Sequence, residues 1–592
     1  MAPMTALVAL LALAGVLPAA GQTRPVAPAG APAGDWPAAG RDPGLTRFSP
    51  LTELTPANVN ELKVLWSWPT GSLAGHEGNP LVIDGKLYLQ TPHPSRVVAF
   101  DLNQPGAAPL WSYSPPAGRG PVLALCCDVG NRGLAWHPSG KLYLAMFTGD
   151  LVALDARTGK QLWRVTNGDP ATGTTMQSAP LVVGGLVIVG VGGGEFGNRG
   201  YLTGYDAHTG KQAWRAWSMG SDQETLIGPL PNLNYPSHQG PRLGLSTWNA
   251  DSWQRGGGAT WGWLSYDPDL DLVYYGTGAP APMNGYQRIG DNKWTSSLIA
   301  RNPKTGLARW VLQLTPGDRW GFGASNENIL LDLNFGGRAV KGLVHFDRNG
   351  FAYTIDRATG RLLLAQKYGP VNWAREIHTA SSLPVLDSAY LPRASGTTRG
   401  ICPSLMGMKA FQPAAYSPIT ELFFVPAMDL CMDLEPTGAS FQPGQPFVGA
   451  KVRIVTGSSG SRGRFLAWSA TTGSLAWEIR EPFPVFGGAL ATAGGLVFYG
   501  TLDGWLKAVD ATNGRERWRF KTPSGIVSNP ISFAGPNGRQ LIAVVSGIGG
   551  WPGRALKPGP DRRPTDGIEA VSVLADLMGQ VVPGGVLLIL GR

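Results

Sequence analysis

The chain is poor in charge, histidine and cysteine. Of its 592 residues, 15% are charged, seven are His and four are Cys. The His residues are scattered, and no HExxH, CxxC or CxxCH spacing occurs, which excludes the common zinc and c-type haem motifs. GxSxG and Walker loops are also absent. The formal net charge of +9 is spread along the chain without basic clusters among aromatics, so no nucleic-acid partner is expected.

Long apolar runs are missing after the N-terminus. The opening MAPMTALVALLALAGVLPAAGQ combines an apolar run with small residues, which predicts a cleaved signal peptide over 1–21 despite the absence of early Lys or Arg. Residues 22–34 are rich in Pro, Ala and Gly and are predicted to form a flexible spacer. Since no other stretch reaches the length of a membrane span, the sequence predicts a soluble protein exported to the periplasm.

Glycine and proline are abundant, with 82 and 50 residues, as in proteins built of short strands and tight turns. A pattern such as LVALDARTGKQLW recurs and ends at a Trp. Regular copies end at Trp163, Trp214, Trp310, Trp477 and Trp518; the copy at Trp111 carries an insertion, and a degenerate copy has Leu364 in place of the Trp. We interpret each copy as a strand, a Gly turn and a second strand whose Trp packs between neighbouring units.

The repeat length predicts the fold. Most copies are spaced by about 50 residues, which suits one four-stranded unit. Two longer gaps, of 96 residues before Trp310 and 113 before Trp477, are predicted to hide units at YDPDLDLVYYG and YSPITELFFVP. We therefore expect an all-β protein, an eight-bladed β-propeller of four-stranded antiparallel blades over 35–592. Stacked helical repeats are the alternative, but the units alternate and break at Gly like strands.

The four cysteines fall into two natural pairs. Cys126 and Cys127 are adjacent, and a trans peptide holds their Cα atoms roughly 3.8 Å apart, closer than the roughly 5.5 Å of a relaxed disulfide. From the residues alone they are either two buried thiols or a strained bond. Cys402 and Cys431 are the other pair, and an oxidising compartment would let disulfides persist.

Candidate site residues lie in loops between the predicted strands. GGGEFG at 192–197 spells a dinucleotide motif, but another hairpin follows it where that motif needs a helix. Loops at one end of a propeller converge on its axis, so carboxylates, arginines and an aromatic plate are expected to meet there. The candidates are Glu77, Arg132, Glu195, Trp261 and Arg348, with Cys126 and Cys127. Such arginines suit a ligand with several carboxylates, whereas each residue taken singly is better explained as bracing its own blade.

These segments resemble the pyrroloquinoline quinone (PQQ) dependent alcohol dehydrogenases, especially the large subunit of methanol dehydrogenases. The resemblance spans nearly everything from Asp35 onward and is carried by the Trp repeats and by matching segments in the same order. They include DWPAAGRDPGLTRFSPLTEL, CCDVGNRGLAW, WGWLSYDPDLDLVYYGTGAPAP, TPGDRW, HFDRNGFAYTIDR and GIGGWPG.

The resemblance implies a role for each candidate residue. In the family, a strained disulfide of adjacent cysteines covers one face of the quinone and a Trp covers the other, which matches Cys126, Cys127 and Trp261. It also implies an ordinary disulfide between Cys402 and Cys431. The other quinone-binding positions matched are Glu77, Arg132, Gly193, Gly194, Arg348 and Trp551, of which Arg348 would lie near the reactive carbonyl.

The metal positions depart from the family pattern. Family members use a calcium or lanthanide ion held by Glu and Asn, with a second Asp in lanthanide forms, and an Asp as catalytic base. Here Glu195 matches the Glu, but Ala279 stands at the Asn, Gly321 at the base and Gly323 at the second Asp. Ala and Gly offer no side-chain oxygen to a hard cation, so the ion is in doubt. Asp318 and Asn284 lie a few residues away and are the alternative oxygen donors considered, at different places in their loops.

Three smaller departures concern the quinone pocket. They are Gln177 for a Thr, Gly192 for a Ser and Phe486 for a Trp.

The resemblance implies a periplasmic quinoprotein that oxidises a small alcohol or aldehyde and passes electrons to a soluble c-type cytochrome. A homodimer is compatible with it. The missing oxygens raise a second hypothesis, a non-catalytic PQQ carrier or sensor. A propeller used only as an interaction scaffold is the third, and the retained Cys126, Cys127 and Trp261 argue against it.

Overall fold

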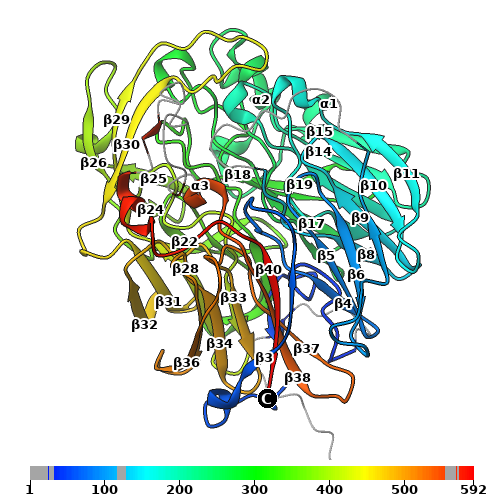
Figure 1. Cartoon of the computed structure of the whole chain (residues 1–592). Helices are drawn as coiled ribbons and strands as arrows, with labels where there is room; N and C mark the ends of the chain where they lie inside the picture. The colour runs from blue at the N-terminus through cyan, green and yellow to red at the C-terminus, as the bar shows by residue number, and fades with distance from the viewer. Residues whose placement is uncertain (1–23, 26–31, 117–128, 554–555, 557–567, 570–571) are drawn as a thin grey trace, which may run out of the picture.

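The computed structural model is built mainly from antiparallel β-strands, and it describes residues 24–25, 32–116, 129–553, 556, 568–569 and 572–592 (Figure 1). The predicted signal peptide, Cys126 and Cys127 lie outside the described residues. Two residues of the predicted spacer form β1 (Arg24–Pro25), which pairs with β20. Among the described residues, no helix has both the length and the apolar character needed to cross a membrane.

Eight of the described sheets contain a run of four antiparallel strands, here called units 1 to 8. In units 1 to 4, strands that are consecutive in the sequence are also neighbours in the sheet. They consist of β4 (Leu81–Ile83), β5 (Lys86–Gln90), β6 (Val97–Asp101) and β7 (Trp111–Tyr113); β8 (Ala135–His137), β9 (Lys141–Ala145), β10 (Asp150–Asp155) and β11 (Gln161–Thr166); β12 (Leu181–Val183), β13 (Leu186–Gly190), β14 (Tyr201–Asp206) and β15 (Gln212–Trp217); and β16 (Ser265–Asp267), β17 (Leu272–Gly276), β18 (Ser297–Arg301) and β19 (Ala308–Gln313).

Units 5 to 7 repeat this plan, with β1 added to the edge of unit 5 and the parallel strand β2 (Phe48–Ser49) added to unit 7. They consist of β20 (Asn328–Phe335), β21 (Arg338–Phe346), β22 (Phe351–Asp356) and β23 (Arg361–Lys367); β27 (Ala415–Ser417), β28 (Leu422–Met428), β31 (Gly463–Ser469) and β32 (Ser474–Glu481); and β33 (Ala489–Thr492), β34 (Leu496–Gly500), β35 (Trp505–Asp510) and β36 (Glu516–Lys521).

Unit 8 joins the two ends of the chain. It consists of β37 (Ile531–Ala534), β38 (Gln540–Ser546), β40 (Val586–Gly591) and, at its edge, β3 (Lys63–Pro69). The blue β3 and the red β40 lie side by side in Figure 1, and they pair from Lys63 opposite Gly591 to Pro69 opposite Val586. Closing a sheet with a strand from the opposite terminus removes an open edge between the first and last units.

The remaining elements are insertions. The hairpin β24 (Ala374–His378) and β25 (Leu383–Leu386) follows unit 5, and a separate sheet contains β26 (Thr398–Ile401), β29 (Leu430–Pro436), β30 (Ala450–Thr456) and β39 (Ile568–Glu569). The disulfide implied by the resemblance, Cys402–Cys431, is present in this region with an S–S distance of 2.00 Å. The short helices are α1 (Asp222–Thr225), α2 (Leu243–Ser246), α3 (Gly550–Gly553), and the 3-10 turns η1 (Val59–Glu61), η2 (Pro170–Thr172), η3 (Gly194–Phe196), η4 (Pro236–His238), η5 (Ser252–Arg255), η6 (Gly285–Gln287), η7 (Ser388–Tyr390) and η10 (Ser572–Leu577).

The expectation of hidden units in the long gaps is wrong. YDPDLDLVYYG forms β16 and β17, and YSPITELFFVP forms β27 and β28, which are the first two strands of the units that end at Trp310 and Trp477. The extra length comes from loops and from the inserted sheet. The missing copy is instead unit 8, whose Trp66 lies on β3 and therefore precedes all the others in the chain.

Five of the repeated Trp residues pack against the Gly turn of the following unit, which agrees with the predicted packing between neighbouring units. A methyl group on Gly159 would lie 2.4 Å from Cε3 of Trp111, and one on Gly210 would lie 2.9 Å from Cε3 of Trp163. In units 1 to 4, 6 and 7 the Trp also faces an Ala or Gly across its own hairpin, as Ala153 faces Trp163. The buried apolar clusters likewise join strands of neighbouring units, so the core lies between sheets. Eight such units are consistent with the predicted eight blades.

This packing predicts that Gly159→Ala destabilises the protein more than Gly140→Ala. Both glycines have positive φ, +70° and +78°, but only Gly159 has a neighbour within 4 Å of an added methyl group. In both variants, alanine must adopt the left-handed backbone conformation, which lowers the free energy of unfolding. Gly159→Ala should lower it by about 1–3 kcal/mol more, because its methyl group displaces the indole of Trp111. Urea unfolding followed by Trp fluorescence compares them, and equal midpoints would contradict the docking role.

Candidate active site

A cavity of about 220 Å³ lies among loops that connect the units. These loops either enter the first strand of a unit, as at Arg132 and Trp261, or join its second and third strands, as at Glu195 and Arg348. In an antiparallel unit both kinds of loop emerge at the same end. The cavity therefore gathers residues that are hundreds of positions apart.

The cavity brings together the described site residues that the sequence predicts. Those that line it are Glu77, Arg132, Gly193, Gly194, Glu195, Trp261, Arg348 and Trp551. Ala279 and Gly321, which stand at expected metal and base positions, also line it, and so do the three smaller departures Gln177, Gly192 and Phe486. Gly323 lies just behind this wall, where a methyl group would be 2.6 Å from the Ala279 nitrogen.

Glu77 and Arg132 form a buried ion pair in the cavity wall. Arg132 Nη2 lies 3.0 Å from Glu77 Oε2, and the two side chains are 3% and 2% exposed. Burial lowers the pKa of Arg132, while the neighbouring carboxylate opposes that shift. Arg132 Nη1 also donates a hydrogen bond of 2.8 Å to the Trp261 carbonyl. Such a pair costs desolvation, but removal of one partner would leave the other charge buried without its counter-charge at 3.0 Å.

The Trp261 ring lies beside two guanidinium groups. The Cζ atom of Arg132 is 5.3 Å from its centroid, and that of Arg348 is 5.5 Å away. The Trp261 carbonyl accepts hydrogen bonds from both Arg132 and the Ser178 hydroxyl, which holds the loop in place. The Trp261 ring is thus a flat aromatic surface with two guanidinium groups, those of Arg132 and Arg348, close to it.

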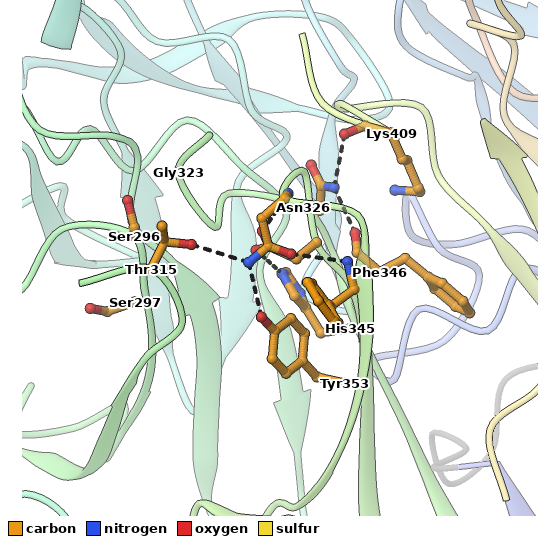
Figure 2. A network of polar contacts seen from close by, with 12 residues as sticks. Ser296, Ser297, Thr315, Gly323, Asn326, His345, Phe346, Tyr353 and Lys409 are labelled. Carbon is orange, nitrogen blue, oxygen red and sulfur yellow. Dashed lines mark hydrogen bonds and ion pairs between the residues drawn. The ribbon is translucent and has the colours of Figure 1, made fainter. Parts of the chain in front are cut away.

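Arg348 projects from a rigid turn between β21 and β22. Asp347 accepts a hydrogen bond from the Asn349 backbone nitrogen at 2.8 Å, and its other carboxylate oxygen lies 2.9 Å from His345 Nε2. Asn349 Nδ2 donates to the Tyr353 hydroxyl at 2.9 Å. In Figure 2, dashed lines lead to the hydroxyl groups of Thr315 and Tyr353, which accept hydrogen bonds from Asn349 Nδ2. Because Asp347, His345 and Asn349 are fully buried, the backbone of Arg348 has little freedom to move.

A second part of the network ties the same turn to unit 6. Asn326 Nδ2 donates to the Phe346 carbonyl at 2.7 Å and to the Lys409 carbonyl at 3.2 Å, as Figure 2 shows. Lys409 in turn is paired with Glu327 at 2.5 Å, and both side chains are almost completely buried. The turn is therefore braced from two sides before any ligand binds.

Several buried donors in the cavity have no acceptor among the described residues. They are Nε of Arg132, Nε of Arg348 and Nε1 of Trp551. Burial lowers the pKa of Arg348 to about 10, which leaves its guanidinium charged at neutral pH. Because unpaired buried donors are costly, this set favours a ligand that brings several anionic or carbonyl oxygens.

Glu195 differs from Glu77 because no described cation balances it. It occupies η3, a single turn between Gly193 and Gly197, whose φ angles of +96° and +74° require glycine. The side chain is partly accessible, and that surface lies in the cavity. Burial of the turn raises the pKa of Glu195. Glu195 is thus a carboxylate available to a ligand.

The donor set does not fit a calcium or lanthanide ion. Asp318 is turned away from the cavity and accepts from the backbone nitrogens of Gly321 at 2.9 Å and Gly323 at 2.8 Å. Asn284 caps η6 through the Tyr286 nitrogen, so neither alternative donor replaces the missing oxygens. Within the described ranges, no three His, Cys, Asp or Glu residues are grouped as a metal site would require.

The apolar side of the cavity is not predicted by any sequence motif. This wall is formed by residues that belong to no motif and come from loops of units 4 to 6: Met283, Phe322, Leu405, Met406, Phe447 and Val448. The one sequence signal for an apolar wall is the composition of these loops, since GAPAPMN and FVG contain no charged residue.

Comparison with known proteins agrees with this geometry. Residues 36–376 and 478–542 match the family described as PQQ: glucose/ethanol/alcohol dehydrogenase, beta-propeller domain. The chain is 46% identical over 545 residues to a lanthanide-dependent methanol dehydrogenase of Methylacidiphilum fumariolicum, covering 91% of this chain and 89% of the relative. It is 41% identical to methanol dehydrogenase [cytochrome c] subunit 1 of Methylorubrum extorquens, covering 93% and 90%.

A solved structure gives the same result. The europium-containing methanol dehydrogenase superposes with a TM-score of 0.92 at 45% identity, covering 95% of this chain and 98% of that chain.

Proposed function

Because this chain belongs to the PQQ-dependent alcohol dehydrogenase family, we propose that it binds PQQ in the cavity as an alcohol dehydrogenase-like quinoprotein. The observation that carries this proposal is the arrangement of Arg132 and Arg348 around Trp261, with buried donors that the described residues leave without acceptors. A planar ligand rich in carboxylates and carbonyls would satisfy those donors and cover the Trp261 ring.

Each described residue has a distinct role in this proposal. Trp261 supplies one face of the binding slot, and Cys126 and Cys127 are proposed as the opposite face. Arg132, held by Glu77, and Arg348, held by its turn, bind the oxygens of the ligand. When bound, PQQ would accept a hydride from a small alcohol or aldehyde, and a soluble c-type cytochrome in the periplasm would take the electrons.

The eight units are proposed to close into an eight-bladed ring around this site. The packing of successive Trp residues on the next unit, and the pairing of β3 with β40, support that arrangement.

A PQQ carrier or sensor is the second candidate. Ala279 and Gly321 line the cavity at positions where the resemblance implies an Asn and an Asp. Neither Ala nor Gly has a side-chain oxygen, so neither residue can accept the proton of an alcohol. The residues proposed to hold the quinone, Arg132, Trp261 and Arg348, are nevertheless present. Catalysis weaker than that of the methanol dehydrogenases, or none, is therefore expected from a protein that still holds the quinone.

PQQ titration of the mature chain tests the proposal. We expect quenching of Trp fluorescence with a dissociation constant of about 1 µM or lower, and less than about a twofold change on adding calcium, lanthanum or chelator, because the donor set lacks ion ligands. A dehydrogenase assay over alcohols and aldehydes then separates enzyme from carrier.

The matched control is Trp261→Ala, which removes the aromatic face but leaves both arginines. Failure of the unmodified chain to bind PQQ would exclude both candidate functions. Binding that requires a metal ion would show instead that the ion site is rebuilt from other residues.

A further inference from the structure

The wall between Glu195 and Gly321 is continuous and apolar. The backbone nitrogen of Phe447 donates to the Glu195 carbonyl at 2.7 Å, and Met283 donates to the Val448 carbonyl at 2.7 Å. A methyl group on Gly321 would lie 3.0 Å from Cε of Met283. The positions at which relatives are expected to hold an ion are therefore connected here by Phe447, Val448 and Met283.

Aromatic rings line the rest of the same space. The cavity contains the rings of Phe196, Trp261, Phe322, Phe411, Phe447 and Phe486. A hydrated metal ion gains nothing from such walls, since it needs several oxygens. A substituted ammonium group is attracted by ring faces and by a carboxylate, and its alkyl groups tolerate an apolar surface.

The charge balance points in the same direction. Glu77 is paired with Arg132, while Glu195 and Arg348 bring one negative and one positive charge to the cavity. The carboxylates of a bound quinone would add further negative charge. That excess favours a cation near Glu195, the carboxylate that no described arginine or lysine balances.

We propose that the cavity binds a small organic cation beside Glu195, and that the substrate class is an alcohol bearing a substituted ammonium group. This inference rests on the proposed function and specifies its substrate. In the reaction, the carbinol C–H bond would break and its hydrogen would transfer as hydride to the bound quinone, which would take up one proton from solvent to give the quinol. The hydroxyl proton passes to solvent, the carbon–oxygen bond becomes double, and the ammonium group remains unchanged.

Choline and its neutral isostere, in which a tert-butyl group replaces the trimethylammonium group, test the proposal. Calorimetric titration of the PQQ-loaded full chain should show choline binding at least about tenfold tighter, because only choline carries the charge that Glu195 and the rings recognise. Glu195→Gln keeps the shape of the side chain, and it should abolish this preference by weakening choline about tenfold while leaving the isostere unchanged.

Three results would overturn the proposal: equal binding of the two ligands, a choline preference that survives Glu195→Gln, or displacement of choline by micromolar lanthanum. The same titrations without PQQ, together with the PQQ titration itself, separate the two proposals. A choline preference in a chain that cannot bind PQQ would refute the proposed function and leave the cation site supported. PQQ binding without a choline preference would refute the cation site and leave the proposed function supported.

Discussion

Replacing Gly321 by Asp is expected to raise the rate of alcohol oxidation by the PQQ-loaded protein by about 10²-fold, the lower range for a positioned general base. Gly321 lines the cavity, and an added side chain would meet the flexible end of Met283, whose Cε lies 3.0 Å away, before any backbone. Its φ of +79° is left-handed, a conformation that Asp tolerates better than most residues. Steady-state oxidation of small alcohols with an artificial electron acceptor would measure the gain.

Gly321→Asn is the control for this prediction, because it adds the same volume and polarity but accepts no proton at neutral pH. Only the Asp variant should show a new acidic limb in its pH profile. Similar rates for Asp and Asn would mean that the missing base is not what limits turnover. PQQ affinity, measured in parallel, ensures that the rates compare equally loaded proteins.

Gly323→Asp should behave differently from Gly321→Asp. A Cβ atom there would lie 2.6 Å from the Ala279 nitrogen and 3.0 Å from the Gly278 carbonyl carbon, so backbone must move. We expect a loss of about 2 kcal/mol or more in the free energy of unfolding, because two packed loops would have to separate. Denaturant unfolding measures this loss, and stability equal to that of the unmodified chain would show that the loops yield easily.

Replacing Arg132 by Met should lower the free energy of unfolding by about 3–5 kcal/mol, because the carboxylate of Glu77 would remain buried without that cation. The same change should weaken PQQ binding by about 10- to 100-fold, since a charge-assisted hydrogen bond contributes roughly 1.5–3 kcal/mol. Urea unfolding and PQQ titration measure the two effects separately.

The double variant Glu77→Gln with Arg132→Met separates stability from binding. It removes both charges, so most of the lost stability should return, whereas PQQ affinity should stay low. If the single variant were as stable as the unmodified chain, the pair would not be the desolvated contact that its 3.0 Å distance and low exposure indicate. If the double variant bound PQQ normally, Arg132 would not be a quinone ligand.

The repeats illustrate how far the fold could be predicted. The Trp and Gly of each hairpin are local in sequence, so seven copies and their packing role could be recognised. The sequence does not reveal Trp66 as a member of the repeat, because unit 8 takes β3 from one end of the chain and three strands from the other. No continuous copy of the repeat pattern therefore exists for this unit. The long gaps before Trp310 and Trp477 led to a wrong prediction of hidden units for a similar reason. The sequence length of a gap does not distinguish an inserted loop or sheet from an additional unit.

The site shows the same limit. Glu77, Arg132, Glu195, Trp261 and Arg348 are predicted because each lies in a loop between predicted strands and matches a family position. Asp318 also lies in a segment that resembles the family, and only its hydrogen bonds to Gly321 and Gly323 show that it organises the loop and does not face the cavity. The direction of a side chain depends on loop geometry, which a motif does not encode.

The sequence alone determined the repeat, the strand character, the family and the absence of oxygens at positions 279, 321 and 323, because these are properties of residue type and local spacing. The tertiary structure alone decided that Phe447, Val448 and Met283 join Glu195 to Gly321, and that Glu195 faces the cavity without a described cation. Those contacts form between loops of different units, and loop contacts over long sequence separations follow from how the units pack.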